Sequence, residues 1–280
     1  MILEVIKWNL TLGQEPQTFL GAKWIEKILE RIPESKKRLW ALRFVSMSPH
    51  YFISEIPEYR KMSKEHVLES SYQSVRQSRI DICNKLLNKH LQTSDIVLDY
   101  GCGPGFIANV VSENVKKIYA VDISAGAIAC AKILNGAENI QYLRADNEGL
   151  RKISNNSIDV VYSFAVAQHL KDEVLNEVLR NCHQKLKTGG KLLLHIQMTN
   201  EIWKTQEDCA KDASIKGKIK YQYDLHCFGR SEEKYLELVG SQGFENCSLE
   251  EFKGFDAQYD EELKSQRLLI AYKKDLGFMQ

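Results

Sequence analysis

Apolar residues before residue 91 recur at helical spacing. They repeat every three to four positions between Phe19 and Ile32, and Pro33 ends the run. A second run covers residues 36–47, and a third starts after Ser63, a residue type that favours helix N-caps, and continues to about residue 90. The pattern predicts a helical N-terminal segment.

From residue 91 the pattern changes to short apolar runs that alternate with helical stretches. The predicted strands are 96–100, 117–122, 140–145, 158–164 and 191–196. Repeated strand–helix units with apolar strands predict an α/β fold, in which a mostly parallel sheet is covered on both faces. Two further apolar runs, 244–252 and 267–273, predict two C-terminal strands that close the sheet.

These patterns divide the chain into two parts. Residues 1–90 are expected to form a helical lid or cap that packs on the core and is not an independent domain. Residues 91–280 are expected to form the α/β domain, with a polar insertion at about 199–224. The insertion contains Trp203, Tyr221 and Tyr223, and together with the N-terminal helices it suits a pocket for a mid-sized organic molecule.

The composition is that of an ordinary globular protein. Of 280 residues, 44% are hydrophobic and 27% are charged, and the net charge of +1 gives no overall attraction to nucleic acid or to an anionic membrane. No apolar stretch is long enough for a signal peptide or a membrane span. The seven cysteines include no Cys-x-x-Cys pair, which disfavours a disulfide framework and a structural zinc site and favours the reducing cytoplasm.

A glycine-rich turn follows the first predicted strand. Gly101, Gly103 and Gly105 let a ligand approach the backbone without a clash against a Cβ atom. Dinucleotide-binding turns have a third fingerprint glycine where this chain has Phe106, and they do not require the acidic Asp99 at the strand end. The turn therefore departs from the dinucleotide pattern.

A second acidic residue, Asp122, lies at the end of the next predicted strand, 21 residues after Gly101. A carboxylate at that place can accept hydrogen bonds from both hydroxyls of a ribose. Each such charge-assisted bond contributes roughly 1.5–3 kcal/mol. The two features together predict that the first two strands bind a nucleoside.

Five segments resemble, in order, the motifs of class I S-adenosylmethionine-dependent methyltransferases, particularly the type 11 group that acts on small molecules. The first reads Val-Leu-Asp-Tyr-Gly-Cys-Gly-Pro-Gly at residues 97–105, and the others lie at 121–124, 145–146, 157–170 and 186–192. The resemblance covers about residues 95–195. It implies a Rossmann-like class I methyltransferase sheet that binds S-adenosyl-L-methionine and releases S-adenosyl-L-homocysteine.

The resemblance also implies which residues bind this cofactor. Asp122 would accept the ribose hydroxyls, and Asp146 would meet the adenine amino group. The full set on the motifs is Asp99, Gly101, Cys102, Gly103, Gly105, Asp122, Ile123, Asp146, Asn147 and Phe164. In related enzymes a helix before the first strand often covers the cofactor. On that ground Tyr72 and Arg76, four apart on one helix face, join the set, with an ordinary face packed on the core as the alternative.

In this family the methyl group moves by in-line displacement, for which the enzyme mainly supplies alignment and a dry site. A base is needed only for a protonated acceptor such as a hydroxyl. His169, after the fourth strand, is the candidate base because histidine titrates near neutral pH, and its alternative role is to shape the pocket wall. His195 and His226 are rival candidates, and no cluster with metal-ligand spacing is visible.

The predicted function is methyl transfer to a small organic molecule. The fourth strand ends in Ser-Phe-Ala-Val, not Asp/Asn-Pro-Pro-Tyr, which disfavours methylation of adenine or glutamine nitrogen. Two alternatives stay open. One is an RNA methyltransferase that binds through the lysine run at 211–220, although such a run is ordinarily a solvated face. The other is a non-catalytic partner protein that keeps the fold. The acceptor atom and the oligomeric state are left open.

Overall fold

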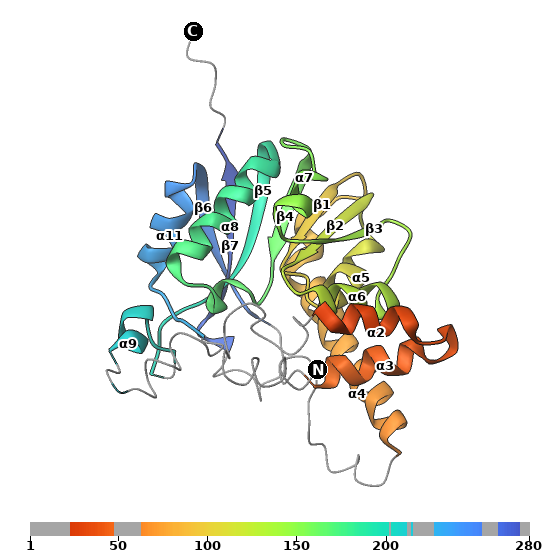
Figure 1. The fold of residues 1–280 in the computed structure, drawn as a ribbon. Coiled ribbons are helices and arrows are strands. Elements are labelled where there is room, and N and C mark those ends of the chain that lie inside the picture. The colour runs from red at the N-terminus through yellow and green to blue at the C-terminus, as the bar shows by residue number, and fades with distance from the viewer. Residues whose placement is uncertain are drawn as a thin grey trace.

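The computed structural model describes residues 23–47, 63–201, 203–211, 214, 227–253 and 263–274, and it is built around one sheet flanked by helices (Figure 1). Within these residues the sheet has seven strands in the order β3-β2-β1-β4-β5-β7-β6. The strands are β1 (Ile96–Tyr100), β2 (Lys117–Asp122), β3 (Ile140–Arg144), β4 (Ile158–Ser163), β5 (Leu186–Gln197), β6 (Phe244–Glu251) and β7 (Gln266–Lys273).

The first five strands are parallel, and β7 pairs antiparallel with both β5 and β6. The predicted α/β class, the mostly parallel sheet and the two closing C-terminal strands are therefore confirmed. The strand order changes direction at β1, which has β2 on one side and β4 on the other. In open sheets of this kind, ligands bind outside the carboxyl ends of the strands at such a switch point.

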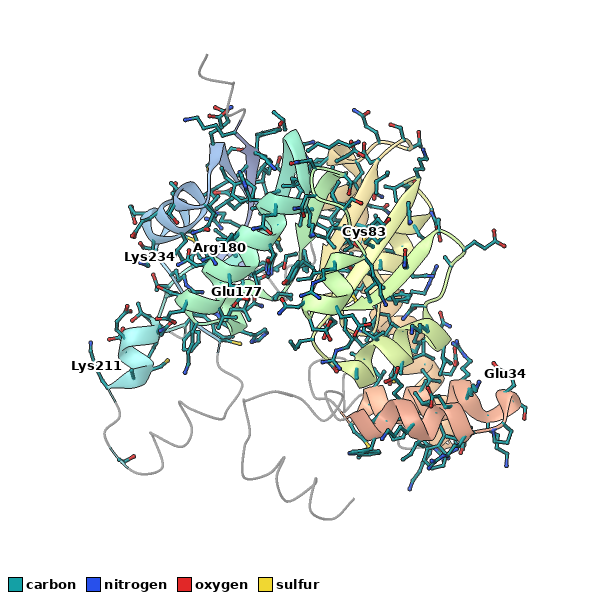
Figure 2. The ribbon with its side chains drawn as sticks, turned by 45° about the horizontal axis from the view of Figure 1, so that its top comes forward. Glu34, Cys83, Glu177, Arg180, Lys211 and Lys234 are labelled. Carbon is teal, nitrogen blue, oxygen red and sulfur yellow. The ribbon has the colours of Figure 1, made fainter. Side chains whose placement is uncertain are left out.

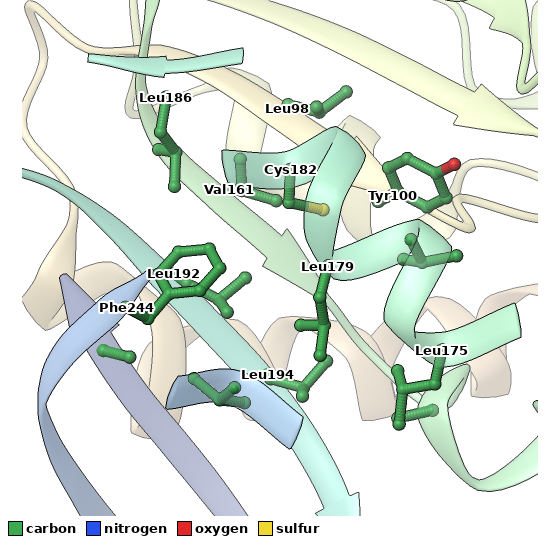
Figure 3. Close-up of a cluster of buried hydrophobic side chains, with 14 of the residues drawn as sticks. Leu98, Tyr100, Val161, Leu175, Leu179, Cys182, Leu186, Leu192, Leu194 and Phe244 are labelled. Carbon is green, nitrogen blue, oxygen red and sulfur yellow. The ribbon is translucent and has the colours of Figure 1, made fainter. Parts of the chain in front are cut away.

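Helices cover both faces of the sheet. They are α2 (Lys23–Arg31), α3 (Glu34–Ser46), α4 (Lys64–Ile82), α5 (Phe106–Ser112), α6 (Ala125–Leu134), α7 (Asn147–Arg151), α8 (Asp172–Lys185), α9 (Gln206–Ala210) and α11 (Glu232–Ser241). Neighbouring residues of a buried strand point to opposite faces. In β1, Val97 therefore packs with α5 and α6, whereas Leu98 packs with α8 and α11. Figure 3 shows the second layer, in which Leu179 and Cys182 of α8 lie over the sheet.

The N-terminal helices form a further layer outside α6. Ile25 of α2 and Leu42 of α3 join Cys130 and Leu134 of α6 in one buried cluster. Figure 1 shows α2 and α3 beside α6, at the β3 end of the sheet. The described helices before residue 90 thus share buried surface with the α/β domain. Their role as a lid stays a prediction, and residues 1–22 and 48–62 lie outside the described residues.

Some local elements differ from the sequence expectation. The helix expected to reach residue 90 ends at Ile82 and continues as a π-helical turn (Cys83–Leu87) and a 3-10 turn (Asn88–His90). β5 begins earlier than the predicted residue 191, because Leu186 already pairs with Ile158. Short helices such as α7 and α9 were not expected, since five residues are too few to show a helical period.

The predicted insertion at 199–224 is described only in part. Tyr221, Tyr223, His226 and the lysines at 216, 218 and 220 lie outside the described residues. Trp203 is half-buried. Lys211 is exposed after α9 and pairs with Asp208 at 2.6 Å (Figure 2). In the part of the chain that the structure describes, no helix has both the length and the apolar character needed to cross a bilayer.

Candidate functional site

Two glycines of the turn after β1 occupy places where a side chain could not fit. A Cβ atom on Gly101 would lie 2.3 Å from the Val166 side chain, and one on Gly105 would lie 2.3 Å from the Tyr142 hydroxyl. Both glycines have positive φ, +88° and +81°, a conformation that other residues rarely adopt. Glycine at these two positions therefore lets the Val166 and Tyr142 side chains pack directly on the turn at the carboxyl end of β1.

Asp122 at the end of β2 is tied to this turn. Its Oδ2 accepts the backbone N–H of Gly103 at 2.8 Å, and its Oδ1 accepts that of Ser124 at 2.8 Å. Burial raises the pKa of the carboxyl group, and the two backbone donors oppose the shift. Each carboxylate oxygen has a further lone pair, so Asp122 keeps the capacity to accept hydrogen bonds from a ligand.

Asp99, near the end of β1, is a buried acid with an incomplete set of partners. Its side chain is on the same face of the sheet as Tyr162 of β4, and the two residues are paired in the register. Within the described residues, Asp99 Oδ2 has no hydrogen-bond partner. Burial raises the pKa of Asp99 to about 8; the Tyr162 hydroxyl opposes this shift, and the Asp122 charge adds to it. A buried acceptor of this kind is costly unless a donor reaches it.

The other predicted cofactor residues of β1 to β3 lie at the same edge of the sheet. Ile123 follows Asp122 and is 44% exposed, which is unusual for a large apolar side chain. Asp146 Oδ1 caps α7 by accepting the N–H of Gly149 at 2.9 Å, and the exposed Asn147 begins that helix. The Cys102 thiol lies within the turn, 3.6 Å from the Gly103 carbonyl oxygen.

Tyr72 and Arg76 of α4 have different surroundings. Tyr72 is buried, its ring packs on Phe106 with the centroids 5.3 Å apart, and its hydroxyl donates to Asn135. The Arg76 guanidinium lies 3.6 Å from the Glu113 carboxylate. Glu113 follows the C-terminal end of α5, whereas the glycine turn precedes the N-terminal end of that helix. Tyr72 thus reaches the turn through other residues, and a direct contact of either side chain with the cofactor stays a prediction.

The segment after β4 is fixed by a histidine of β5. His195 Nδ1 accepts the N–H of Ala165 at 3.0 Å, and its Nε2 lies 2.9 Å from Gln266 Oε1. Its ring stacks on Phe164, with the centroids 4.4 Å apart. Burial lowers the pKa of His195 to about 4. Both ring nitrogens are engaged, so the geometry does not favour His195 as the base.

His169, the candidate base, ends a 3-10 turn (Ala167–His169) beside the same strand. Its Nδ1 lies 3.4 Å from the Cys227 sulfur, and burial raises the pKa of that thiol to about 11. A neutral thiol can donate weakly to an imidazole nitrogen. His226, the other rival, lies outside the described residues.

Arg230 anchors the segment that carries His169. Its side chain is only 3% exposed; Nε donates to Asp172 Oδ1 at 2.8 Å and Nη1 donates to the Ala167 carbonyl at 3.1 Å. Nη2 donates to the Leu170 carbonyl. One guanidinium thus closes the loop on both sides of His169, using the planar fork that is specific to arginine.

Comparison with known proteins agrees with this geometry. Residues 98–194 match the family model described as a methyltransferase domain, which spans the glycine turn, Asp122, Asp146 and the His169 segment. Residues 98–194 of this chain are therefore similar to a methyltransferase domain.

Curated relatives of the methyltransferase domain match at low identity. A ubiquinone biosynthesis O-methyltransferase of Pseudomonas fluorescens is 26% identical over 98 residues, which are 34% of this chain and 41% of the relative. Phosphoethanolamine N-methyltransferase 1 of Caenorhabditis elegans is 27% identical over 172 residues, which are 61% of this chain and 32% of the relative. The chain thus spans less than half the length of either relative.

A solved structure shows the same fold. The S-adenosylmethionine dependent methyltransferase from Mesorhizobium loti superimposes with a TM-score of 0.50 and 22% identity, over 65% of this chain and 93% of that one. At this identity the likeness supports the architecture of the methyltransferase domain.

Two residues that hold loops at this edge of the sheet were not found from the sequence. Arg230 lies 58 residues from its partner Asp172, and Asn135 lies 31 residues from the turn residue Pro104. Neither belongs to a recognisable motif. Asn135 precedes a glycine after α6, and that pattern indicates only the end of a helix.

Proposed function

We propose that this chain transfers a methyl group from S-adenosyl-L-methionine to a small organic acceptor. The observation that carries the proposal is the link between Asp122 and the Gly103 N–H, beside glycines whose places exclude a Cβ atom. This arrangement holds a candidate ribose acceptor against the glycine turn. The match to the methyltransferase domain supports the cofactor assignment.

The charges and hydrogen-bonding groups at this edge support binding of the cofactor. Asp122 would accept its ribose hydroxyls, and Ile123 would cover one side of its adenine ring, whose amino group would meet Asp146. Asp99 Oδ2, buried and without a partner in the described residues, suits a cationic or N–H donor group. When bound, S-adenosyl-L-methionine supplies an electrophilic methyl group on its sulfonium. Phe164 and the glycine turn would exclude water from that methyl group.

The acceptor would enter at the ends of β4 and β5. His169 lies beside this entrance, fixed by the Arg230 contacts to Ala167 and Leu170. For an acceptor that carries a hydroxyl proton, the imidazole would take that proton as the methyl group arrives. The names of the two relatives, an O-methyltransferase and an N-methyltransferase, support a small-molecule acceptor. We further propose that the protein acts in the reducing cytoplasm, where its seven cysteines would stay free thiols.

Binding of S-adenosyl-L-homocysteine to the full chain tests the proposal. Calorimetry is expected to show one site for this product and no binding of NAD. Asp122→Ala removes the ribose acceptor and is expected to weaken binding on the order of tenfold or more, because charge-assisted hydrogen bonds are lost.

Asp208→Ala on the exposed α9 is the matched control and should bind S-adenosyl-L-homocysteine like the wild type. Equal binding of NAD, or full affinity in the Asp122 variant, contradicts the assignment. Methyl transfer to small phenols and amines from labelled cofactor, with RNA as the comparison substrate, then separates the small-molecule function from the RNA alternative.

A further inference from the structure

Asn135 lies at the junction of the N-terminal helices and the glycine turn. It follows α6, is 1% exposed, and uses both atoms of its amide. Its Nδ2 donates to the carbonyl oxygen of Pro104, inside the turn, at 2.7 Å. Its Oδ1 accepts the hydroxyl of Tyr72 at 2.8 Å. The Pro104 carbonyl can only accept, so it fixes the position of Nδ2, and Oδ1 then faces the Tyr72 hydroxyl as an acceptor.

The backbone of Asn135 contacts the turn by a second route. Its carbonyl oxygen accepts the hydroxyl of Tyr142 at 2.8 Å. That hydroxyl lies directly under Gly105, 2.3 Å from the place of a Cβ atom. One residue after α6 therefore contacts Pro104 with its side chain and supports Gly105 through Tyr142.

Tyr72 brings the N-terminal helices into this network. Its ring packs on Phe106, the first residue of α5 after the turn, and the Arg38 guanidinium of α3 lies 4.8 Å above the same ring. Its hydroxyl has the Leu134 carbonyl, at 3.0 Å, as a second acceptor. Tyr72 is thus in contact with α3, α5 and the end of α6 together.

We propose that Tyr72 and Asn135 are positioning residues for the cofactor site, and that the relay from Tyr72 through Asn135 to Pro104 makes the geometry of the glycine turn depend on the N-terminal helices. The inference rests on the proposed function, because it takes the turn to be the cofactor site. Without the Tyr72 hydroxyl, Asn135 Oδ1 loses its partner in a buried place. The amide then reorients, and its contact with Pro104 loosens.

Tyr72→Phe tests the relay, because it removes one hydroxyl and keeps the ring on Phe106. Affinity for S-adenosyl-L-homocysteine is expected to fall roughly five- to tenfold, the effect of one buried hydrogen bond. The KM for S-adenosyl-L-methionine should rise by a similar factor, while kcat at saturating cofactor stays near the wild-type value. The backbone N–H of Gly105 donates to the Cys102 carbonyl, and that of Asn109 donates to the Gly105 carbonyl. In the ligand-free variant, hydrogen exchange at these two amides should be faster than in the wild type.

Tyr119→Phe is the matched control, since the Tyr119 hydroxyl accepts a hydrogen bond from Lys117 and lies on β2 outside the relay. It should change neither affinity nor exchange at the turn. Asn135→Asp separates the two halves of the relay, because it keeps an acceptor for Tyr72 and removes the donor to Pro104. It is expected to weaken binding more than Tyr72→Phe does.

The outcomes are distinguishable. Unchanged affinity in Tyr72→Phe overturns the proposal, as does a lower unfolding temperature with no change in affinity. If the wild-type protein binds no S-adenosyl-L-homocysteine, the proposed function fails. The exchange rates in the ligand-free variants then decide by themselves whether the relay orders the turn.

Discussion

His195 Nδ1 accepts the backbone N–H of Ala165 at 3.0 Å, which links the end of β5 to the turn after β4. Ala165 has a φ of +59°, a left-handed conformation that costs a residue with a Cβ atom about 1–2 kcal/mol. An N–H donor at Nδ1 requires the neutral tautomer with its proton on Nε2, which faces Gln266. The histidine therefore stabilises an unfavourable turn as a neutral group.

A pH dependence of stability follows from this buried, neutral ring. Burial lowers the pKa of folded His195 to about 4, from 6.5 in the unfolded chain. The unfolded state therefore binds the proton first as pH falls. Stability from His195 is fully present above about pH 6.5 and is lost progressively toward pH 4, by on the order of a few kcal/mol.

His195→Asn keeps an acceptor for Ala165 and removes the titrating group. We expect the fall in unfolding free energy between pH 7 and pH 4, measured by urea titration, to be smaller in this variant than in the wild type. His66→Asn, at an exposed position of α4, controls for the substitution itself. An identical pH dependence in His195→Asn and wild type would show that the ring is not kept neutral in the fold.

Arg230 supplies a second prediction, on stability. Replacing it with Met retains an apolar stem but removes the buried donor to Asp172 and the donors to the carbonyls of Ala167 and Leu170. Removing one partner of a buried ion pair costs about 3–5 kcal/mol. We expect a loss of that order in the free energy of unfolding of Arg230→Met.

Lys234→Met is the control for Arg230→Met, because Lys234 approaches the same carboxylate, at 3.7 Å, with a partly exposed side chain (Figure 2). An exposed pair of this kind contributes at most about 1 kcal/mol. Similar losses in the two variants would refute the view that Arg230 orders the loop.

The parts of this fold that the sequence predicts depend on neighbouring residues. Apolar runs such as 96–100 and 117–122 read as strands because both their sides are buried, and the glycines of the turn stand within five residues of one another. A continuous apolar run likewise predicts β7, whereas β6 is an edge strand in which buried and more exposed residues alternate. A short stretch of sequence is enough to predict an element whose conformation depends on residues within that stretch.

The contacts that adjust the site are not local, and the sequence does not show them. Tyr72 meets Asn135 across 63 residues, and Arg230 meets Ala167 across 63. The pattern placed Tyr72 on a helix face near the cofactor site, but it could not distinguish a ligand contact from a hydrogen bond to the end of α6. Only the packing of α4 against α5 and α6 decides which atoms its hydroxyl meets.

A third prediction concerns His169 as the base. For an acceptor with a hydroxyl group, His169→Ala is expected to lower kcat about a hundredfold or more, because the proton acceptor is missing. Affinity for S-adenosyl-L-homocysteine should be unchanged. Cys227→Ala removes the neighbouring thiol, keeps the imidazole, and is expected to retain most of the activity. Normal turnover of His169→Ala on the true substrate would leave His169 as part of the pocket wall.

The last prediction concerns the N-terminal helices as a lid. The structure fixes where a truncation can be made: Cys83, Leu86 and Leu87 belong to the core cluster under the sheet, so a cut at residue 90 would open that core. A cut at residue 62 removes α2 and α3 and keeps α4. If the removed helices serve as the lid predicted from the sequence, this shortened chain should retain its sheet by circular dichroism and lose methyl transfer, because water would then reach the bound cofactor.

Hydrogen exchange on the full chain checks the same idea without a truncation. If the helices close over the bound cofactor, the amides of α4 around Tyr72 and Arg76 should exchange more slowly after addition of S-adenosyl-L-homocysteine. The amides of α11, on the opposite face and at the other end of the sheet (Figure 1), should not change. Unchanged exchange in α4, combined with methyl transfer by the chain cut at residue 62, would mean that these helices only pack on α6 and do not serve as a lid.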